Sequence, residues 1–357
     1  MTWRDTAITR MLGLSAPVIL GPFGANMSSE QLVALVSEAG GLGIFGANAL
    51  SPAGIIDVAK QIRSRTSKPF GLNLWIPMPD QPLSEPVGFA RTLDRLQPYF
   101  SALGLDMPSP PARFSESYDE QVEALLETRP AVFSFVYGAP TKDVLTECRR
   151  RGIITVGTAT SVPEAEFLHA AGVDAIVVTG FEAGGHRASF LEPAEDSLHG
   201  LIALLPRVAD RVALPLIAAG GIADGRGVAA AFTLGASAVQ IGTAFLACTE
   251  SSIDDDYRAA LRGARGASTC LTRAFTGRLA RAIPNRFTAE MAGVDPAPYP
   301  VQSWLTGQIR RAARAQGRSD LQNWWAGQAA PLVKNLHAAD LFHALVDETE
   351  AVMHQRR

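Results

Sequence analysis

The sequence predicts an α/β protein: a (β/α)8 TIM barrel with an excursion after strand 3 and a C-terminal helical extension. The 357 residues suffice for a barrel of about 250 residues and an extension. Short apolar runs alternate with amphipathic stretches, and eight such runs can be counted. The runs lack period-two alternation, which is typical of parallel strands covered on both faces. A doubly wound open sheet is the runner-up, although six strands normally suffice for it.

The order of elements follows from periodicity and capping residues. The first expected strand is 18–20; serines that can cap a helix follow it, and apolar residues then recur at helical spacing over 32–39. A Gly-Gly pair ends that helix. The remaining strands are expected at 42–45, 70–76, 131–137, 153–156, 175–178, 215–218 and 238–241. Helices are expected near 55–62, 144–151, 163–171, 198–209 and 227–234.

Two segments lie outside this repeat. Residues 77–117 are rich in proline and predict an irregular excursion with a short helix near 90–96. Residues 251–357 predict a helical extension that packs on the barrel of residues 1–250. Its helical stretches are expected near 255–262, 301–315 and 332–353.

The composition excludes several functions. There are 32 Lys and Arg residues against 35 Asp and Glu, a net charge of −3, which gives no electrostatic case for binding nucleic acid or an anionic membrane. The most apolar stretch, 228–246, is interrupted by polar residues and glycines, so no membrane span is expected. Three scattered cysteines indicate neither a disulfide framework nor a metal site, and they suit a cytoplasmic protein.

Glycines follow the last two expected strands, where barrel enzymes recurrently bind phosphate. Gly220 and Gly221 come after the seventh run, and the eighth run ends in Gln240, Ile241, Gly242 and Thr243. Glycines let backbone N–H groups approach an anion closely, and a helix N-terminus adds its positive end. These loops therefore predict a phosphate site; the simpler alternative is that the glycines only make turns.

Other polar residues are delivered to the same end of the barrel. His186 follows the sixth run, and an imidazole can act as acid or base near neutral pH. Its alternative role is that of an ordinary structural histidine. Asn73 is polar within the apolar third run, where its amide could contact a heterocycle or cap the strand. Glu182 is expected to orient the loop, with a second acid–base group as the alternative. Arg187 is expected to be solvated, with attraction of anions as the alternative.

Four motifs together resemble the nitronate monooxygenase family, formerly called 2-nitropropane dioxygenase. They are Gly-Leu-Asn-Leu at 71–74, Glu-Ala-Gly-Gly-His at 182–186, Ala-Gly-Gly-Ile at 219–222 and Gln-Ile-Gly-Thr at 240–243. The resemblance covers roughly residues 15 to 330, including 276–281 and 325–328 in the extension. It implies an FMN-binding TIM barrel.

The resemblance also implies roles for single residues. Asn73 would contact the isoalloxazine ring, Gly184 would line the flavin, and His186 would face the substrate as a candidate base. Phe23 and Thr179 depart from the usual family residues at the cofactor face, which makes a different or bulkier substrate plausible. The phosphate would be held by Gly220, Gly221, Gln240, Ile241, Gly242 and Thr243.

The activity that the resemblance implies is FMN-dependent oxidation of nitronates or nitroalkanes by O2 to a carbonyl compound and nitrite. The partners would be a small-molecule substrate and O2, and a homo-oligomer is left open. One alternative is an NAD(P)H-dependent FMN reductase of an enoyl thioester or quinone. Another is a flavin- or phosphate-binding protein without turnover. Trp304, Trp324 and Trp325 lead us to expect that the extension helps cover the flavin.

Overall fold

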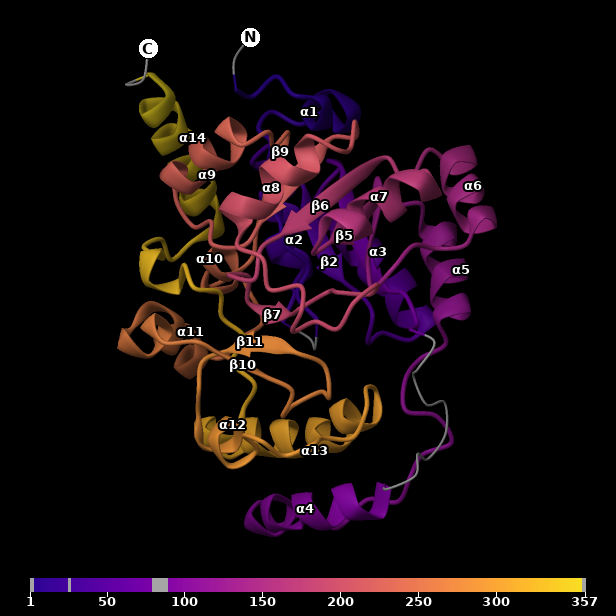
Figure 1. Ribbon diagram of the computed structural model, residues 1–357, viewed down its shortest axis with the longest axis vertical. Helices are drawn as coiled ribbons and strands as arrows, with labels where there is room; N and C mark the ends of the chain where they lie inside the picture. Colours follow the sequence, from indigo (N-terminus) through magenta and orange to yellow (C-terminus); the bar gives the residue numbers. More distant parts are fainter. Residues whose placement is uncertain (1–2, 25–26, 79–88, 355–357) are drawn as a thin grey trace.

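The computed structural model describes residues 3–24, 27–78 and 89–354, and its central element is a barrel of eight parallel strands (Figure 1). A bridge between Ile19 and Leu42 places the two edge strands side by side, so the sheet closes on itself. Each of the eight expected strands is present, and the predicted fold class is confirmed. In sheet order the strands are β1 (Val18–Leu20), β9 (Ala238–Ile241), β8 (Leu216–Ala219), β6 (Ala175–Thr179), β5 (Ile154–Ala159), β4 (Val132–Val136), β3 (Phe70–Trp75) and β2 (Gly43–Gly46).

Amphipathic helices surround the barrel, and most start at a residue whose side chain accepts a hydrogen bond from the first turn, as serine, threonine and aspartate do. The helix α1 (Ala7–Leu12) instead closes one end of the barrel, because Ile8 and Leu12 pack with inward-facing strand residues. The surrounding helices are α2 (Glu30–Glu38), α3 (Pro52–Arg65), α5 (Tyr118–Thr128), α6 (Lys142–Arg151), α7 (Val162–Ala171), α8 (Leu201–Ala209) and α9 (Gly225–Thr233).

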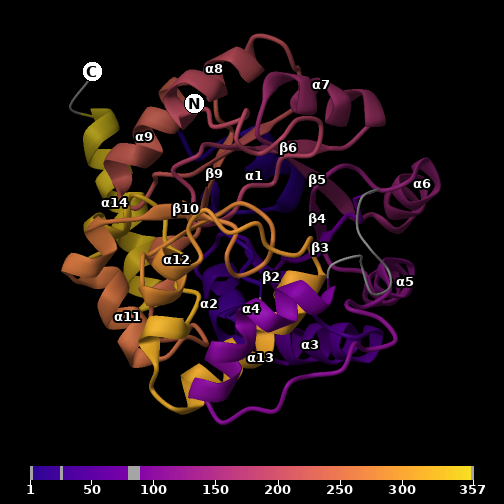
Figure 2. The same cartoon turned by 60° about the horizontal axis from the view of Figure 1, so that its bottom comes forward.

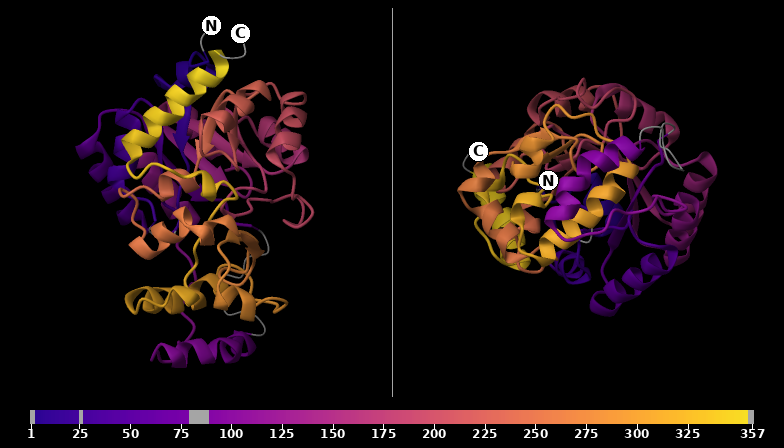
Figure 3. Two further views of the ribbon diagram at one scale, coloured as in Figure 1. Left: turned by 90° about the vertical axis from the view of Figure 1, so that its left-hand side faces the viewer. Right: turned by 90° about the horizontal axis from the view of Figure 1, so that it is seen from below.

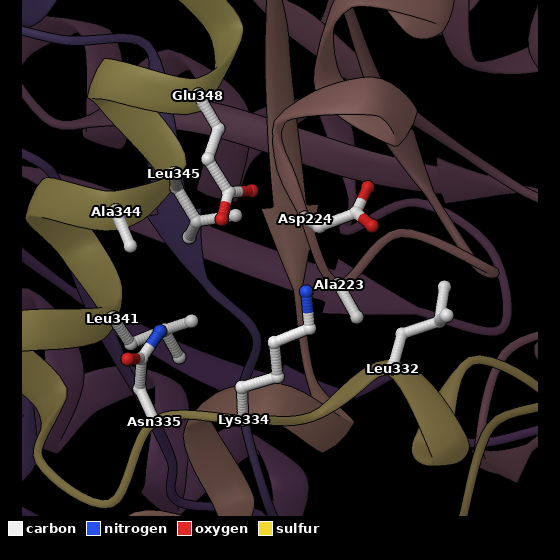
Figure 4. A pocket seen from close by; sticks show the side chains of 9 residues that line it. All are labelled: Ala223, Asp224, Leu332, Lys334, Asn335, Leu341, Ala344, Leu345 and Glu348. Atoms are coloured by element: carbon white, nitrogen blue, oxygen red, sulfur yellow. The ribbon is translucent and has the colours of Figure 1, made fainter.

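The last helix, α14 (Ala338–His354), packs against both α9 and α2, the place of an eighth barrel helix. The Glu348 carboxylate accepts a hydrogen bond of 2.9 Å from the N–H of Gly225, where α9 begins. Figure 4 shows Glu348 on α14 and, across from it, Asp224, which precedes Gly225. Helix α14 begins later than the expected residue 332. The segment before it is a loop, in which the carbonyl of Leu336 accepts a hydrogen bond from the Thr249 N–H (2.8 Å). The division of the chain into a barrel of residues 1–250 and an extension of residues 251–357 stays a prediction.

The excursion after β3 carries a helix longer than the expected 90–96, namely α4 (Phe89–Ala102). Tertiary packing explains the difference: Leu96, Tyr99 and Phe100 are buried, and α4 lies beside α13 (Val301–Ala315) (Figures 2 and 3). The two helices lie at the end of the barrel opposite α1 (Figure 1). The C-terminal half of the chain also forms α10 (Thr243–Leu246), α11 (Asp255–Arg262) and α12 (Arg286–Glu290).

A second, small sheet joins the chain after β6 to the C-terminal part. Its antiparallel strands are β7 (Gly185–His186), β11 (Ala280–Ala282) and β10 (Cys270–Thr272), with β11 in the centre. The sequence analysis did not anticipate this sheet. Among the described residues, no helix has both the length and the apolar character needed to cross a membrane.

Candidate active site

A cavity of about 870 Å³ lies at the carboxyl ends of the barrel strands and reaches α13. It is lined by the ends of β1, β3, β6, β8 and β9 and by the C-terminal segment around residues 322–329. The structure brings all but one of the predicted site residues to this cavity. The exception is Ile241, whose side chain is fully buried in the core. The residues at the cavity are Phe23, Asn73, Thr179, Gly184, His186, Gly220, Gly221, Gln240, Gly242 and Thr243.

His186 is held by the small sheet and by aromatic side chains. It pairs with Ala280 across β7 and β11, and its Nε2 lies 2.9 Å from the Thr276 hydroxyl oxygen. The ring of Trp75 meets the imidazole edge-on at a centroid distance of 4.9 Å, and that of Trp325 lies at 5.2 Å. The imidazole is therefore fixed by neighbours from β3 and from the C-terminal part of the chain.

These surroundings keep His186 neutral. Burial and, to a smaller extent, the positive charges of Arg278 and Arg310 together lower its pKa to about 3. A neutral imidazole carries a proton on one nitrogen and a lone pair on the other. Nε2 can donate to the Thr276 hydroxyl or accept from it, and the same hydroxyl also lies within hydrogen-bond distance of the Arg278 carbonyl (3.3 Å).

Arg278 is enclosed by aromatic rings near His186. Its guanidinium carbon lies 3.8 Å from the ring centroid of Tyr137 and 4.1 Å from that of Tyr299. Such contacts stabilise a cation that is removed from water. Tyr137 has a backbone φ of +71°, a conformation that non-glycine residues rarely adopt and that clusters at functional sites. The sequence analysis missed Arg278 and Tyr137.

The loop that carries His186 is fastened by two charged residues. The Glu182 carboxylate accepts from the N–H of Leu201 (2.9 Å) at the start of α8, where Gly200 offers no side-chain cap. Glu182 thus orients the loop, as predicted. The prediction that Arg187 is solvated is wrong. Arg187 is buried because the loop folds over its side chain, which donates to the carbonyls of Thr179 (2.7 Å), Thr160 (3.0 Å) and Ser197.

The glycines after β8 and β9 form a cradle at the cavity wall. Gly220 and Gly221 have φ values of +104° and +70°, which favour glycine, and a Cβ on Gly220 would lie 3.1 Å from the Gly180 carbonyl oxygen. A Cβ on Gly242 would meet only Phe23, at 3.8 Å, so a side chain there would project into the cavity. The Thr243 hydroxyl accepts from Gly327 N–H (2.9 Å) and can donate its own proton to a ligand. This cradle fits a phosphate group.

Asn73 has a fixed orientation at the opposite wall. Its Nδ2 donates to the Ser134 hydroxyl at 2.6 Å, and the two residues are register partners in β3 and β4. Both side chains are buried, and both line the cavity. An amide held in this way can present defined polar atoms to the edge of a heterocycle.

The C-terminal segment passes against the His186 loop at Gly184. A Cβ on Gly184 would lie 2.5 Å from Gly327 N and 2.6 Å from Ala326 C, so only glycine permits this approach. Trp304, Trp324 and Trp325 also line the cavity. The motif at 325–328 was visible in the sequence, but nothing local indicated that it contacts residue 184.

The barrel, its cavity and the neutral histidine define an enzyme that acts on a small molecule at the mouth of a TIM barrel. Residues 5–348 match the family model described as nitronate monooxygenase, and the chain belongs to this family. Oxidoreductase activity and the family predicted from the motifs are thereby confirmed.

Relatives agree with this assignment. A nitronate monooxygenase from Paraburkholderia phytofirmans is 41% identical over 98% of this chain and 97% of its own length. One from Pseudomonas aeruginosa is 43% identical, over 95% of this chain and 98% of its own length. Among solved structures, nitroalkane oxidase from Streptomyces ansochromogenes has a TM-score of 0.92 at 36% identity and covers 99% of this chain and 100% of its own. FabK from Thermotoga maritima has a TM-score of 0.76 at 28% identity, with 99% and 98% covered. Family membership supports a flavin as the cofactor.

Proposed function

We propose that this protein uses FMN to oxidise alkyl nitronates with O2, giving a carbonyl compound and nitrite. The observation that carries the proposal is that one cavity holds the glycine cradle, the oriented amide of Asn73 and the neutral His186. FMN, when bound, supplies the electron chemistry, and the protein supplies binding, orientation and electrostatics.

The cradle residues would hold the FMN phosphate. Gly242 leaves room for it, and Gly220 and Gly221, the Thr243 hydroxyl and the backbone near Gln240 and Ile241 would complete the site. Phe23, Asn73, Thr179 and Gly184 would surround the isoalloxazine ring, since they line the same cavity.

The charges near His186 favour an anionic substrate. Arg278 and Arg310 act on this imidazole, so their positive potential extends into the cavity and attracts a nitronate. A nitronate has already lost its α-proton and needs no base. A neutral nitroalkane needs one, and the imidazole of His186 is the group that would take the proton. Because a pKa of about 3 makes this imidazole a weak base, nitronates are the better substrates.

Anaerobic mixing tests the proposal. The FMN-loaded protein should lose its flavin absorbance rapidly with ethyl nitronate and only slowly with NADH, and in air nitrite should form as the nitronate disappears. Rapid bleaching by NADH with none by the nitronate would instead indicate the reductase.

A His186→Asn variant separates the two substrates. We expect it to lose most activity with nitroethane, because no base remains, while it retains activity with ethyl nitronate. Equal losses with both substrates would contradict the assigned role of His186 as the base.

A further inference from the structure

The orientation of the His186 imidazole depends on a partner that distinguishes its two nitrogens. The rings of Trp75 and Trp325 lie 4.9 and 5.2 Å from it, centroid to centroid, and hold it by shape. A half-turn about the Cβ–Cγ bond exchanges nitrogen and carbon positions and leaves the shape of the ring almost unchanged, so this packing does not select one orientation. The 2.9 Å contact between Nε2 and the Thr276 hydroxyl does select one, because after a half-turn a carbon atom would face that hydroxyl.

The Thr276 hydroxyl is itself held in place. Thr276 is buried, and its side-chain oxygen accepts a hydrogen bond of 3.3 Å from the N–H of Arg278, two residues further along the chain. The turn between them is fixed at Gly277, whose N–H donates to the Arg273 carbonyl (2.8 Å) and whose carbonyl accepts from Nη1 of Arg273 (2.8 Å). Because threonine is β-branched, its χ1 angle is restricted as well. The hydroxyl therefore meets His186 at a defined position.

The three polar contacts of this hydroxyl can be satisfied together in one way only. The N–H of Arg278 can only donate, and the carbonyl of Arg278, also at 3.3 Å, can only accept. Because a hydroxyl has one proton, all three contacts are hydrogen bonds at once when that proton goes to the carbonyl and Nε2–H of His186 donates to the hydroxyl oxygen. His186 is neutral, so its lone pair then lies on Nδ1.

We propose that Thr276 is a positioning residue that holds His186 with Nε2 protonated and leaves the lone pair of Nδ1 to a neutral nitroalkane in the cavity, which both residues line. The inference rests on the proposed function, in which the imidazole takes the α-proton. The proton moves from the α-carbon to Nδ1, and the electron pair of the broken C–H bond stays on the substrate, which becomes the nitronate. His186 becomes a cation in this step, and the Thr276 oxygen accepts from Nε2–H before and after it. No proton has to pass between His186 and Thr276.

Nitrogen NMR tests the position of the proton without using activity. In the FMN-loaded protein with isotope-labelled histidine, the signals of His186 are those that the His186→Asn substitution removes. Near neutral pH we expect Nε2 of His186 to carry the proton and Nδ1 to carry none. Thr276→Val has the same shape but no hydroxyl, so we expect a mixture of the two tautomers in that variant. A protonated Nδ1 in the native protein would overturn the proposal, and so would His186 signals in Thr276→Val that equal the native ones.

A comparison of two substrates separates positioning from a structural role. Thr276→Val should lower kcat/KM with nitroethane about tenfold, which corresponds to the loss of one hydrogen bond, and should change the value with ethyl nitronate by less than about twofold, because a nitronate needs no base. Thr276→Ser keeps the hydroxyl and should restore most of the nitroethane activity. The matched control is Thr128→Val on α5, away from the cavity. The Thr128 hydroxyl also donates to a carbonyl, that of Leu125 (2.8 Å), and its removal should leave both values unchanged.

Rates are expressed per bound flavin, so that loss of cofactor from a variant does not enter the comparison. Equal losses with the two substrates in Thr276→Val would show that Thr276 only supports the local fold, and this result would overturn the positioning role. Failure of Thr276→Ser to restore the nitroethane activity would do the same. If ethyl nitronate fails to bleach the flavin of the native enzyme, the proposed function is rejected, whereas the proton position measured by NMR does not depend on that function.

Discussion

Replacing Gly184 with alanine is expected to displace the C-terminal segment from the mouth of the barrel. The new Cβ would lie 2.5 Å from Gly327 N and 2.6 Å from Ala326 C. Non-bonded carbon contacts are optimal near 3.5–4.0 Å, so this backbone must move by about 1 Å. Two hydrogen bonds depend on its position: Gly327 N–H to the Thr243 hydroxyl and Gln328 N–H to the Glu182 carbonyl, both 2.9 Å.

The magnitude follows from these contacts. Two lost hydrogen bonds remove about 1 kcal/mol each, and overpacking adds roughly 1–3 kcal/mol, which gives about 3–5 kcal/mol in all. Urea unfolding followed by tryptophan fluorescence measures this loss, and dialysis measures FMN retention, which should fall because Thr243 is displaced.

The neighbouring Gly185→Ala substitution is the control. Gly185 has a φ of +76°, but its Cβ would meet nothing within 4 Å, so alanine costs about 1–2 kcal/mol of backbone strain and no clash. If the two alanine variants unfold at the same urea concentration and retain FMN equally, the close approach of the two segments is refuted.

Three further substitutions test the surroundings of the site. Because the native His186 has a pKa of about 3 and an unfolded histidine one near 6.5, the unfolded state binds the extra proton between these values. The free energy of unfolding should therefore fall as the pH drops through this window, and His186→Asn should weaken that dependence in urea titrations at pH 4.5 and 7.5. Glu182→Gln should cost about 1 kcal/mol in urea unfolding, because α8 loses its charged cap, whereas the exposed Glu192→Gln should have no effect. Arg187→Met should cost about 3 kcal/mol, because three buried carbonyls lose their donor, while Arg207→Met on the surface should cost little in the same assay.

Most of the barrel could be predicted because its signals are local. A strand is a short apolar run, and a helix starts at a capping side chain such as Ser51 and repeats its apolar residues at helical spacing. The expected helices at 255–262 and 301–315 have the observed bounds of α11 and α13. The helix α4 was underestimated because Pro98 suggested an interruption, and contacts with α13 and, through Tyr99, with α12 stabilise the remaining turns.

The candidate site was predictable where topology alone decides position. Parallel barrel strands all point their carboxyl ends to one mouth, so glycines after β8 and β9 and Asn73 in β3 had to face the same space. The partners of these residues were not predictable. Thr276 lies ninety residues beyond His186 in the sequence, and the pairing of β7 with β11 brings the two together. A strand of two residues, 185–186, is too short to show a periodic pattern, so this pairing could not be predicted.

The contacts missed from the sequence are also those that set the charge of the site. Glycines and an asparagine carry no charge, so they do not determine the electrostatic potential of a cofactor site. A histidine considered from the sequence alone could equally be charged or neutral. Burial decides the matter first, and the charges of Arg278, enclosed by Tyr137 and Tyr299, and of Arg310 on α13 act in the same direction, so that His186 stays neutral. Under the proposed function, a site built in this way would bind an anion without protonating it. This property suits a nitronate, because protonation on carbon would return it to the nitroalkane, which must lose that proton again before it reacts.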